Sequence, residues 1–218
     1  MDGIMATAGK VPQSADEWDA KYKAAACDYF DWYLSSAELQ PHLQTILDRY
    51  DASCEIFVPG CGMSELAFHL YEMGYEHVTN ADTSAMAIQR MAREQDRRRA
   101  TAMECVVLDA INMPDVPDQC FDVVVDKGLL DTVLCGANNI ENAVALVHEL
   151  HRVLKVNGTF VLISHGPPDT RLHYLTRETL EWTVHPPTPI ERAGRDGCMT
   201  SLGTPRLCYM YTCHRQLL

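Results

Sequence analysis

Two glycines flank a cysteine at Gly60-Cys61-Gly62, between the apolar run "CEIFVP" and the helix-like run "SELAFHLYEM". Glycines at a turn from a strand into a helix let the backbone approach a ligand closely, although a tight turn alone would also use them. A dinucleotide-binding turn would carry a third glycine at position 65, where the chain has Glu65. No Gly-Lys-Ser or Gly-Lys-Thr follows to make a phosphate-binding loop. The turn is therefore predicted to hold a ligand that presents no pyrophosphate.

Carboxylates end the next two strand-like runs, where Asp82 closes "HVTNAD" and Asp109 closes "MECVVLD". Each could simply be a turn acid, and Asp82 stands just before a helix start, where acids commonly cap. Open parallel sheets, however, bind ligands at the carboxyl ends of neighbouring strands, where an acid can accept hydrogen bonds from a ribose diol. We expect Asp82 to hold a ribose and Asp109 to meet the exocyclic amine of an adenine. A ligand with a ribose and an adenine but no pyrophosphate is S-adenosylmethionine.

The fourth strand-like run ends in "VVVDKGLLD", which contains Asp126, Lys127 and Asp131. A charged loop that merely leaves a buried strand would contain the same residue types. We interpret the loop as facing the methyl donor and the acceptor, with Asp126 supplying negative charge near a reacting amine. Asp126, Lys127 and Asp131 are therefore the candidate catalytic residues.

Other reactive side chains carry less weight. Cys61 has no evident paired base, so it is not predicted to be a nucleophile. His148 and His151 lie three residues apart in "HELH", which is not the zinc-binding pattern His-Glu-x-x-His, and no metal site is predicted. The arginines between positions 90 and 99 are interpreted as the solvated end of a helix.

Alternating strand-like and helix-like runs must position these groups. The predicted strands span 54–58, 77–82, 103–109, 121–128 and 159–165, and the predicted helices span 64–74, 83–99 and 139–158. This alternation is typical of a parallel α/β sheet. After "GPPD" the pattern changes to a short helix near 176–180 and two strand-like runs, "EWTVHP" and "RLCYMYTCHR", which predict an antiparallel hairpin added to the sheet.

Composition limits the class of protein. The 218 residues are 47% hydrophobic and 22% charged, which suits one domain with a buried core. The formal net charge of −12 argues against nucleic acid as a partner, because binding phosphates needs a basic surface. Nine cysteines without a C-x-x-C pair lie mostly in apolar runs, as expected of reduced thiols in a cytoplasmic protein. Neither a secretory leader nor a run of about 18 apolar residues is found, so no membrane partner is expected.

The chain is predicted to have two parts. Residues 1–13 are expected to be a mobile tail, and residues 14–218 a single domain. Within that domain, residues 14–50 are expected to be a helical segment rich in aromatic residues, which either pack against the core or form a lid over a cofactor.

Four stretches together resemble one family: "EWDAKY" with "FDWY", "VPGCGMSELAFHLYEMGY", "VTNADTS" and "FDVVVDKGLLD". Over residues 17–214 the chain resembles the class I S-adenosylmethionine-dependent methyltransferases, and it is similar to the group that methylates lysines of translation elongation factor 1A. The resemblance implies a Rossmann-like α/β sandwich with a mostly parallel, seven-stranded sheet and an antiparallel C-terminal hairpin. It also implies S-adenosyl-L-methionine as the cofactor and a protein substrate such as elongation factor 1A.

The same resemblance implies which residues bind the cofactor. Gly60 and Gly62 would pack under the methionine moiety, and Lys127 would lie near the donor. Asp82 would bind the ribose, and the adenine would lie against Thr83, Asp109 and Ala110. A lid over the pocket would be formed by Trp18, Tyr22 and Trp32. The chain departs from the group at Pro59 and Met63, beside the two glycines.

The expected reaction is an in-line displacement of methyl from a sulfonium to a nucleophile. A lysine has a pKa near ~10.4, so the protein must align it with the donor and favour its neutral form. Two alternatives stay open: a small-molecule methyltransferase with a closed, apolar acceptor pocket, and a non-catalytic module that binds S-adenosylmethionine without turnover. The oligomeric state does not follow from the sequence.

Overall fold

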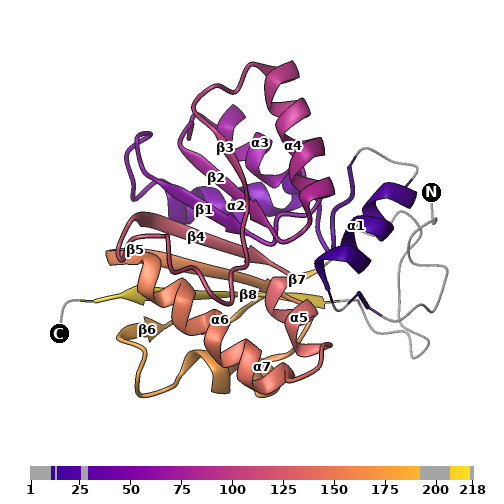
Figure 1. Ribbon diagram of the computed structural model, residues 1–218. Coiled ribbons are helices and arrows are strands. Elements are labelled where there is room, and N and C mark those ends of the chain that lie inside the picture. The colour runs from indigo at the N-terminus through magenta and orange to yellow at the C-terminus, as the bar shows by residue number, and fades with distance from the viewer. Residues whose placement is uncertain (1–10, 13, 26–28, 192–206, 217–218) are drawn as a thin grey trace.

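A computed structural model describes residues 11–12, 14–25, 29–191 and 207–216. Most of the predicted tail, and most of the loop between the last two predicted strands, lie outside these ranges. The described chain forms one sheet with helices on both of its faces (Figure 1).

The sheet has the strand order β3-β2-β1-β4-β5-β8-β6, and β7 also pairs with β8. In chain order the strands are β1 (Ile56–Pro59), β2 (Val78–Asp82), β3 (Glu104–Val107), β4 (Phe121–Lys127), β5 (Leu154–Ser164), β6 (Trp182–Val184), β7 (Thr188–Glu191) and β8 (Leu207–Arg215). The first five pair in parallel, whereas β8 runs antiparallel to β5, β6 and β7. The predicted parallel α/β sheet with antiparallel C-terminal strands is therefore confirmed.

The eighth strand arises because one strand position is split in two. Both β6 and β7 pair with β8, at its last and first residues respectively, on the edge that β5 does not use. Between them, His185 still donates its N–H to the Thr212 carbonyl at 2.9 Å, but Pro186 and Pro187 follow. Proline has no N–H to donate to a strand ladder. The sheet thus has the seven predicted strand positions, one of them interrupted.

Helices cover the two faces through separate hydrophobic clusters. Along the chain the helices are α1 (Ala15–Ala24), α2 (Ser36–Leu47), α3 (Leu66–Glu72), α4 (Ala85–Arg98), α5 (Leu129–Leu134), α6 (Asn139–Val153) and α7 (Pro168–Leu175). Helices α2, α3 and α4 contribute to one cluster, and α5, α6 and α7 contribute to the other. Helix α1 packs beside α4, at the end of the molecule where the sheet's parallel strands finish (Figure 1).

Two predicted helices differ from the structure, and one helix was missed. The helix expected over 139–158 ends at Val153, because Leu154 already pairs with Phe121 as the start of β5. The short helix expected near 176–180 lies earlier, at α7, where Pro168 occupies the first turn and fixes a helical φ. Helix α5 was not predicted, since its six residues are too few for a periodic pattern.

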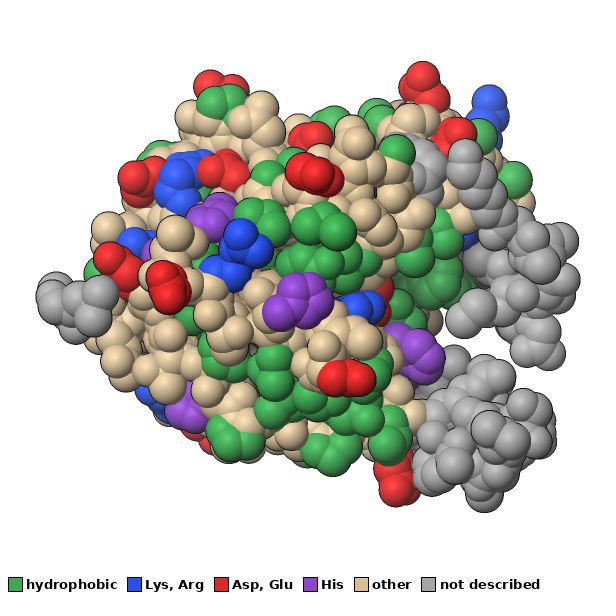
Figure 2. Space-filling model, turned by 90° about the horizontal axis from the view of Figure 1, so that it is seen from below, with side chains coloured by type: hydrophobic (Ala, Val, Ile, Leu, Met, Phe, Trp, Pro, Cys, Tyr) green, Lys and Arg blue, Asp and Glu red, His purple; other side chains and the backbone are tan. Residues whose placement is uncertain are grey.

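Charged side chains on the surface are mixed in sign. Figure 2 shows one face of the molecule, and among the residues coloured there by type the Lys and Arg side chains are scattered between acidic ones rather than gathered into a basic patch. Across the described ranges, no helix is both long enough and apolar enough to cross a bilayer.

Candidate active site

A cavity of about 510 Å³ opens at the carboxyl ends of β1, β2 and β4. Its wall includes ten of the residues singled out from the sequence: Trp18, Tyr22, Trp32, Gly60, Gly62, Asp82, Thr83, Asp109, Ala110 and Lys127. The topology brings these residues together, since parallel strands place their carboxyl ends at one edge of the sheet. All of the residues expected to bind the cofactor therefore face one space.

The glycine turn after β1 leaves room for neighbouring side chains. Gly60 and Gly62 have positive φ angles of +61° and +52°, which side chains rarely tolerate. A Cβ on Gly62 would lie 2.7 Å from the Tyr22 hydroxyl, and a Cβ on Gly60 would lie 2.8 Å from Leu129 Cδ1. The glycines thus let Tyr22 of α1 and Leu129 of α5 approach the turn closely, and they form a part of the cavity wall without side chains.

Asp82, at the end of β2, fixes the glycine turn. Its Oδ2 accepts a hydrogen bond from the Gly62 N–H and its Oδ1 accepts one from the Ser84 N–H, both at 2.8 Å. The side chain is buried, and burial raises the pKa of Asp82 while the two amides oppose that rise. Each carboxylate oxygen keeps a second acceptor position, so the group can still receive a ribose hydroxyl from the cavity.

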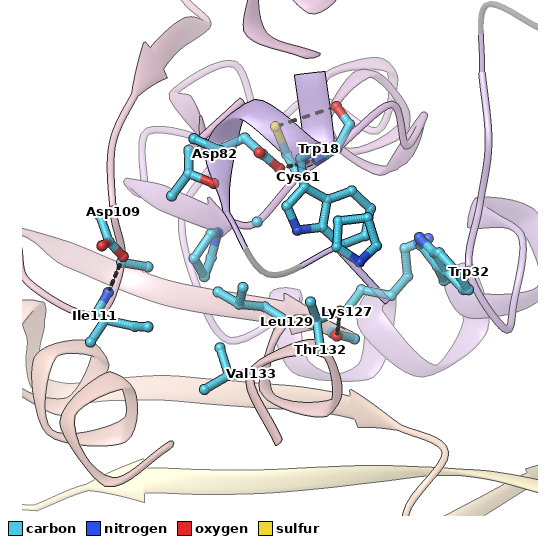
Figure 3. Close-up of a pocket in the computed structure, with 18 of the residues that line it drawn as sticks. Trp18, Trp32, Cys61, Asp82, Asp109, Ile111, Lys127, Leu129, Thr132 and Val133 are labelled. Carbon is cyan, nitrogen blue, oxygen red and sulfur yellow. Dashed lines mark hydrogen bonds between the residues drawn. The ribbon is translucent and has the colours of Figure 1, made fainter. Parts of the chain in front are cut away.

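Asp109 follows β3 and lies at the end of the cavity remote from Trp32. Its Oδ1 accepts a hydrogen bond from the Ile111 N–H at 3.0 Å, which holds the loop after β3 in a turn. Figure 3 shows Asp109 and Ile111 on the side opposite Trp32, with Leu129 and Val133 between them along the lower wall. Asp109 and the aromatic residues thus lie on opposite sides of one cavity.

Aromatic residues of the N-terminal segment close the remaining side. Trp18 and Tyr22 of α1 stack with their ring centroids 5.4 Å apart, and Phe30 packs edge-on against Trp32 at 4.9 Å. The Phe30 N–H donates to the Met63 carbonyl at 2.9 Å, so this segment is tied to the loop that begins α3.

Two aspartates that were not predicted anchor this segment. Asp19 accepts hydrogen bonds from the Ser84 hydroxyl and, at 3.0 Å, from the Met86 N–H at the start of α4. Asp31 accepts one from the Ser64 hydroxyl at 2.5 Å and forms an ion pair with Lys127. Both acids lie inside "EWDAKY" and "FDWY", where the aromatic residues alone were given a role.

Lys127 is the one candidate catalytic residue that lines the cavity. Its side chain is buried, and burial lowers the pKa of Lys127 while the neighbouring Asp31 carboxylate raises it. The ammonium is therefore occupied by Asp31, which makes Lys127 an anchor for the N-terminal segment.

Asp126 and Asp131 are not among the residues that line the cavity, contrary to expectation. The Asp126 carboxylate is fully buried and accepts hydrogen bonds from the Leu129 N–H at 2.7 Å and the Leu130 N–H at 3.0 Å, at the start of α5. Burial raises the pKa of Asp126 to about 7. Side chains alternate along β4, so Asp126 and Lys127 point to opposite faces. The role of Asp126 near a reacting amine stays a prediction, which its position does not favour.

Asp131 instead connects α5 to the end of β5. It accepts hydrogen bonds from the Ser164 hydroxyl at 2.5 Å and from the His165 N–H at 2.8 Å. Arg171 of α7 pairs with it at 3.0 Å. The Asp131 carboxylate thus holds α5, the end of β5 and α7 together. It does not line the cavity in which an acceptor would bind.

The groups that were given little weight have structural partners. Cys61 is buried, and burial raises the pKa of its thiol well above the ordinary value, so it is not poised as a nucleophile. The His151 Nε2 accepts a hydrogen bond from the Glu181 N–H at 3.1 Å. Within the described residues, no three His, Cys, Asp or Glu side chains are grouped as metal ligands.

The family model described as a methyltransferase domain matches residues 51–186, more than half of the chain. The chain belongs to the class I S-adenosylmethionine-dependent methyltransferases. S-adenosyl-L-methionine is the cofactor of this domain, and the residues present fit it. The cavity has the volume of a small-molecule site, the glycine turn leaves space along one wall, and Asp82 keeps free acceptor positions.

Curated relatives of this methyltransferase domain act on elongation factors. The domain is 34% identical over 154 residues to "eEF1A lysine and N-terminal methyltransferase" of Bos taurus, a match covering 69% of this chain and 21% of that protein. It is 27% identical over 176 residues to "EEF1A lysine methyltransferase 4" of Mus musculus, covering 77% of this chain and 67% of that protein. The chain thus spans about a fifth of the length of the first relatives.

Solved structures share the fold at low identity. A SAM-dependent methyltransferase from Methanosarcina mazei superimposes with a TM-score of 0.62 at 17% identity, over 87% of this chain and all of that one. The cyclase SpnF does so with a TM-score of 0.68 at 14% identity, over 95% of this chain and 98% of its own. Since a cyclase shares the fold, the reaction has to be argued from the site.

Proposed function

We propose that this domain transfers a methyl group from S-adenosylmethionine to a lysine side chain of a protein, in the cytoplasm, and that the protein is elongation factor 1A or one like it. The contact of Asp82 with Gly62 carries the methyl-transfer part, because it sets an acid and an open backbone turn at adjacent strand ends in one cavity. The choice of lysine is supported by the relatives, whose names describe lysine methylation of that factor. A net charge of −12 suits a basic protein substrate.

The residues of the chain would bind and orient both reactants. Asp82 would accept hydrogen bonds from the ribose, and Asp109 would accept one from the adenine amine. When bound, the donor supplies an electrophilic methyl group on a sulfonium sulfur. The acceptor would meet the donor at the end of the cavity lined by aromatic residues. There the stacked Trp18 and Tyr22 rings would exclude water.

The acceptor amine has to lose its proton before it attacks. A free lysine, with a pKa near ~10.4, is almost wholly charged at neutral pH. Removing the amine from water lowers its pKa. The aromatic residues at one end of the cavity provide such apolar surroundings. The proton passes to solvent as the amine enters the cavity, while water still reaches it, and the neutral amine is then enclosed.

A labelling experiment tests this proposal. The protein is incubated with a donor carrying a radioactive methyl group and a cell lysate, and the labelled protein is hydrolysed to identify methylated amino acids. Label on methyl-lysine in a band of the size of elongation factor 1A supports the proposal. Label confined to small metabolites contradicts it and favours a small-molecule methyltransferase. No label, although calorimetry shows that the donor binds, would indicate a non-catalytic binding module.

A further inference from the structure

Lys21 of α1 places its ammonium against two indole rings of the cavity wall. Its Nζ lies 4.7 Å from the Trp18 ring centroid and 4.9 Å from the Trp32 ring centroid. Both tryptophans line the cavity, and Figure 3 shows Trp32 beside Lys127, at the end remote from Asp109. Lys21 itself is not among the residues that line the cavity, so an alkylammonium group of the chain contacts these two rings beside the cavity, at the end remote from Asp109.

The two lysines at this end are held in different ways. Lys127 forms an ion pair with Asp31. For Lys21, no ion pair with a carboxylate occurs within the described parts of the chain, and its charge faces the rings. Lys21 is partly buried, and burial lowers the pKa of its amine.

Aromatic rings suit an amine that has to react. A carboxylate would stabilise the charged form and raise the pKa of the amine, which opposes methyl transfer. Two indole faces also attract the ammonium through their quadrupoles, but more weakly than a buried carboxylate does, and such rings also recognise methylated amines. They can hold the amine before and after methylation while water is removed from it.

We propose that Trp18 and Trp32 form the recognition site for the acceptor's lysine amine, and that Lys21 occupies this site until a substrate lysine displaces it. This inference rests on the proposed function, since it requires a lysine acceptor. The fold allows the exchange without movement of the backbone. Helix α1 is anchored to α4 through Asp19, whereas the Lys21 side chain has four rotatable carbons and can swing into solvent.

The test replaces Lys21 by methionine, which keeps an unbranched side chain that favours helix but removes the amine. The matched control is Lys23→Met, which removes the same charge from an exposed position two residues further along α1. For each protein, initial rates are measured with saturating donor against increasing elongation factor 1A, and the donor Kd is measured separately by calorimetry.

An occupied site raises the apparent KM for the acceptor, so the Lys21→Met variant should have a KM about 3- to 30-fold lower than the wild type, the range that one cation–π contact accounts for. Its donor Kd should equal that of the wild type, and Lys23→Met should change neither value. In addition, the ε-CH₂ protons of Lys21, shifted upfield by the rings in the free protein, should return to ordinary NMR positions when elongation factor 1A binds.

Three results would overturn the inference in distinguishable ways. If elongation factor 1A is methylated but Lys21→Met leaves its KM unchanged or raises it, Lys21 only covers the rings, and the proposed function stands. If the Lys21 signals stay in place while other signals report binding of the factor, the site is not shared. If neither wild type nor variant methylates any lysine although both bind the donor, the proposed function fails and the acceptor site fails with it.

Discussion

Asp31 forms an ion pair with the buried Lys127, 96 positions further along the chain, and thereby joins the N-terminal segment to the end of β4. The same carboxylate accepts a hydrogen bond from Ser64, beside the glycine turn. One acid thus connects three parts of the cavity wall. The cavity depends on this connection, because Phe30 and Trp32 flank Asp31 in sequence.

Removing Asp31 should leave Lys127 buried without a counter-charge. We expect Asp31→Ala to lower the free energy of unfolding by about 3 kcal/mol, as measured by chemical denaturation, and to weaken donor binding in calorimetry. The double variant Asp31→Ala/Lys127→Met, which removes both charges, should recover part of the lost stability. A double variant no more stable than Asp31→Ala would show that the unpaired Lys127 charge is not the cause of the lost stability.

Replacing Asp82 should weaken donor binding more than it weakens the fold. Asp82→Ala removes an acceptor for the ribose, and we expect the donor Kd, measured by calorimetry, to rise roughly 10- to 100-fold, as for a lost hydrogen bond to a charged group. Asp115→Ala removes an equal charge at an exposed position outside this cavity and serves as the control. A donor Kd unchanged by Asp82→Ala would refute the assignment of the ribose.

Alanine substitutions at Gly62 and Gly74 distinguish the effect of a strained backbone from that of a crowded side chain. Both Gly62 and Gly74 have positive φ angles, but a Cβ at Gly62 meets the Tyr22 hydroxyl, whereas a Cβ at Gly74 meets nothing within 4 Å. Gly74→Ala should therefore cost about 1 kcal/mol of stability and leave the donor Kd unchanged. Gly62→Ala should in addition displace Tyr22 and weaken donor binding. Equal donor affinities of the two variants would mean that Tyr22 does not close on the glycine turn.

Asp126 should make stability depend on pH. Burial raises its pKa to about 7, above the value of ~3.9 in an unfolded chain. Between these values the folded state holds the extra proton, so this residue's contribution to stability falls as the pH rises from about 4 to about 7. From about pH 5 to pH 8, the wild type should lose roughly 2–3 kcal/mol more unfolding free energy than Asp126→Asn. Parallel losses in the two proteins would contradict the raised pKa.

The histidines make that comparison between two proteins necessary. Burial lowers the pKa of His151 and of His214 to about 4. Their folded forms stay neutral where the unfolded chain is protonated, so their contributions rise with pH between about 4 and 6.5, opposite in sign to that of Asp126. Only the difference between wild type and Asp126→Asn isolates the aspartate.

Much of the fold and of the cofactor wall could be predicted because they depend on local order along the chain. Alternating strands and helices define a parallel sheet, and the ends of β1, β2 and β3 then meet at one edge. Gly60, Asp82 and Asp109 follow from that rule without any knowledge of tertiary contacts. The break within the strand that pairs with β8 was missed, although Pro186 and Pro187 mark it in the sequence.

The rest depends on contacts that sequence spacing does not reveal. Asp19 contacts Ser84, 65 positions further along the chain, and Asp31 contacts Lys127, 96 positions further along. The residues next to either acid in the sequence therefore do not distinguish it from an acid exposed to solvent. For Asp126, the direction of its side chain relative to the cavity was not evident from the sequence. A strand alternates its side chains, and the pattern "VVVDK" does not state which of its last two residues faces the cavity.

Purified components test most directly whether this domain methylates a protein lysine. The protein is incubated with S-adenosylmethionine and elongation factor 1A, and the factor is digested and analysed by mass spectrometry, with Asp82→Ala as the control enzyme. We predict a gain of methyl mass on a lysine of the factor that depends on the donor and is much reduced with Asp82→Ala. An unmodified factor, in a sample where calorimetry shows the donor bound to the wild-type protein, would contradict the account.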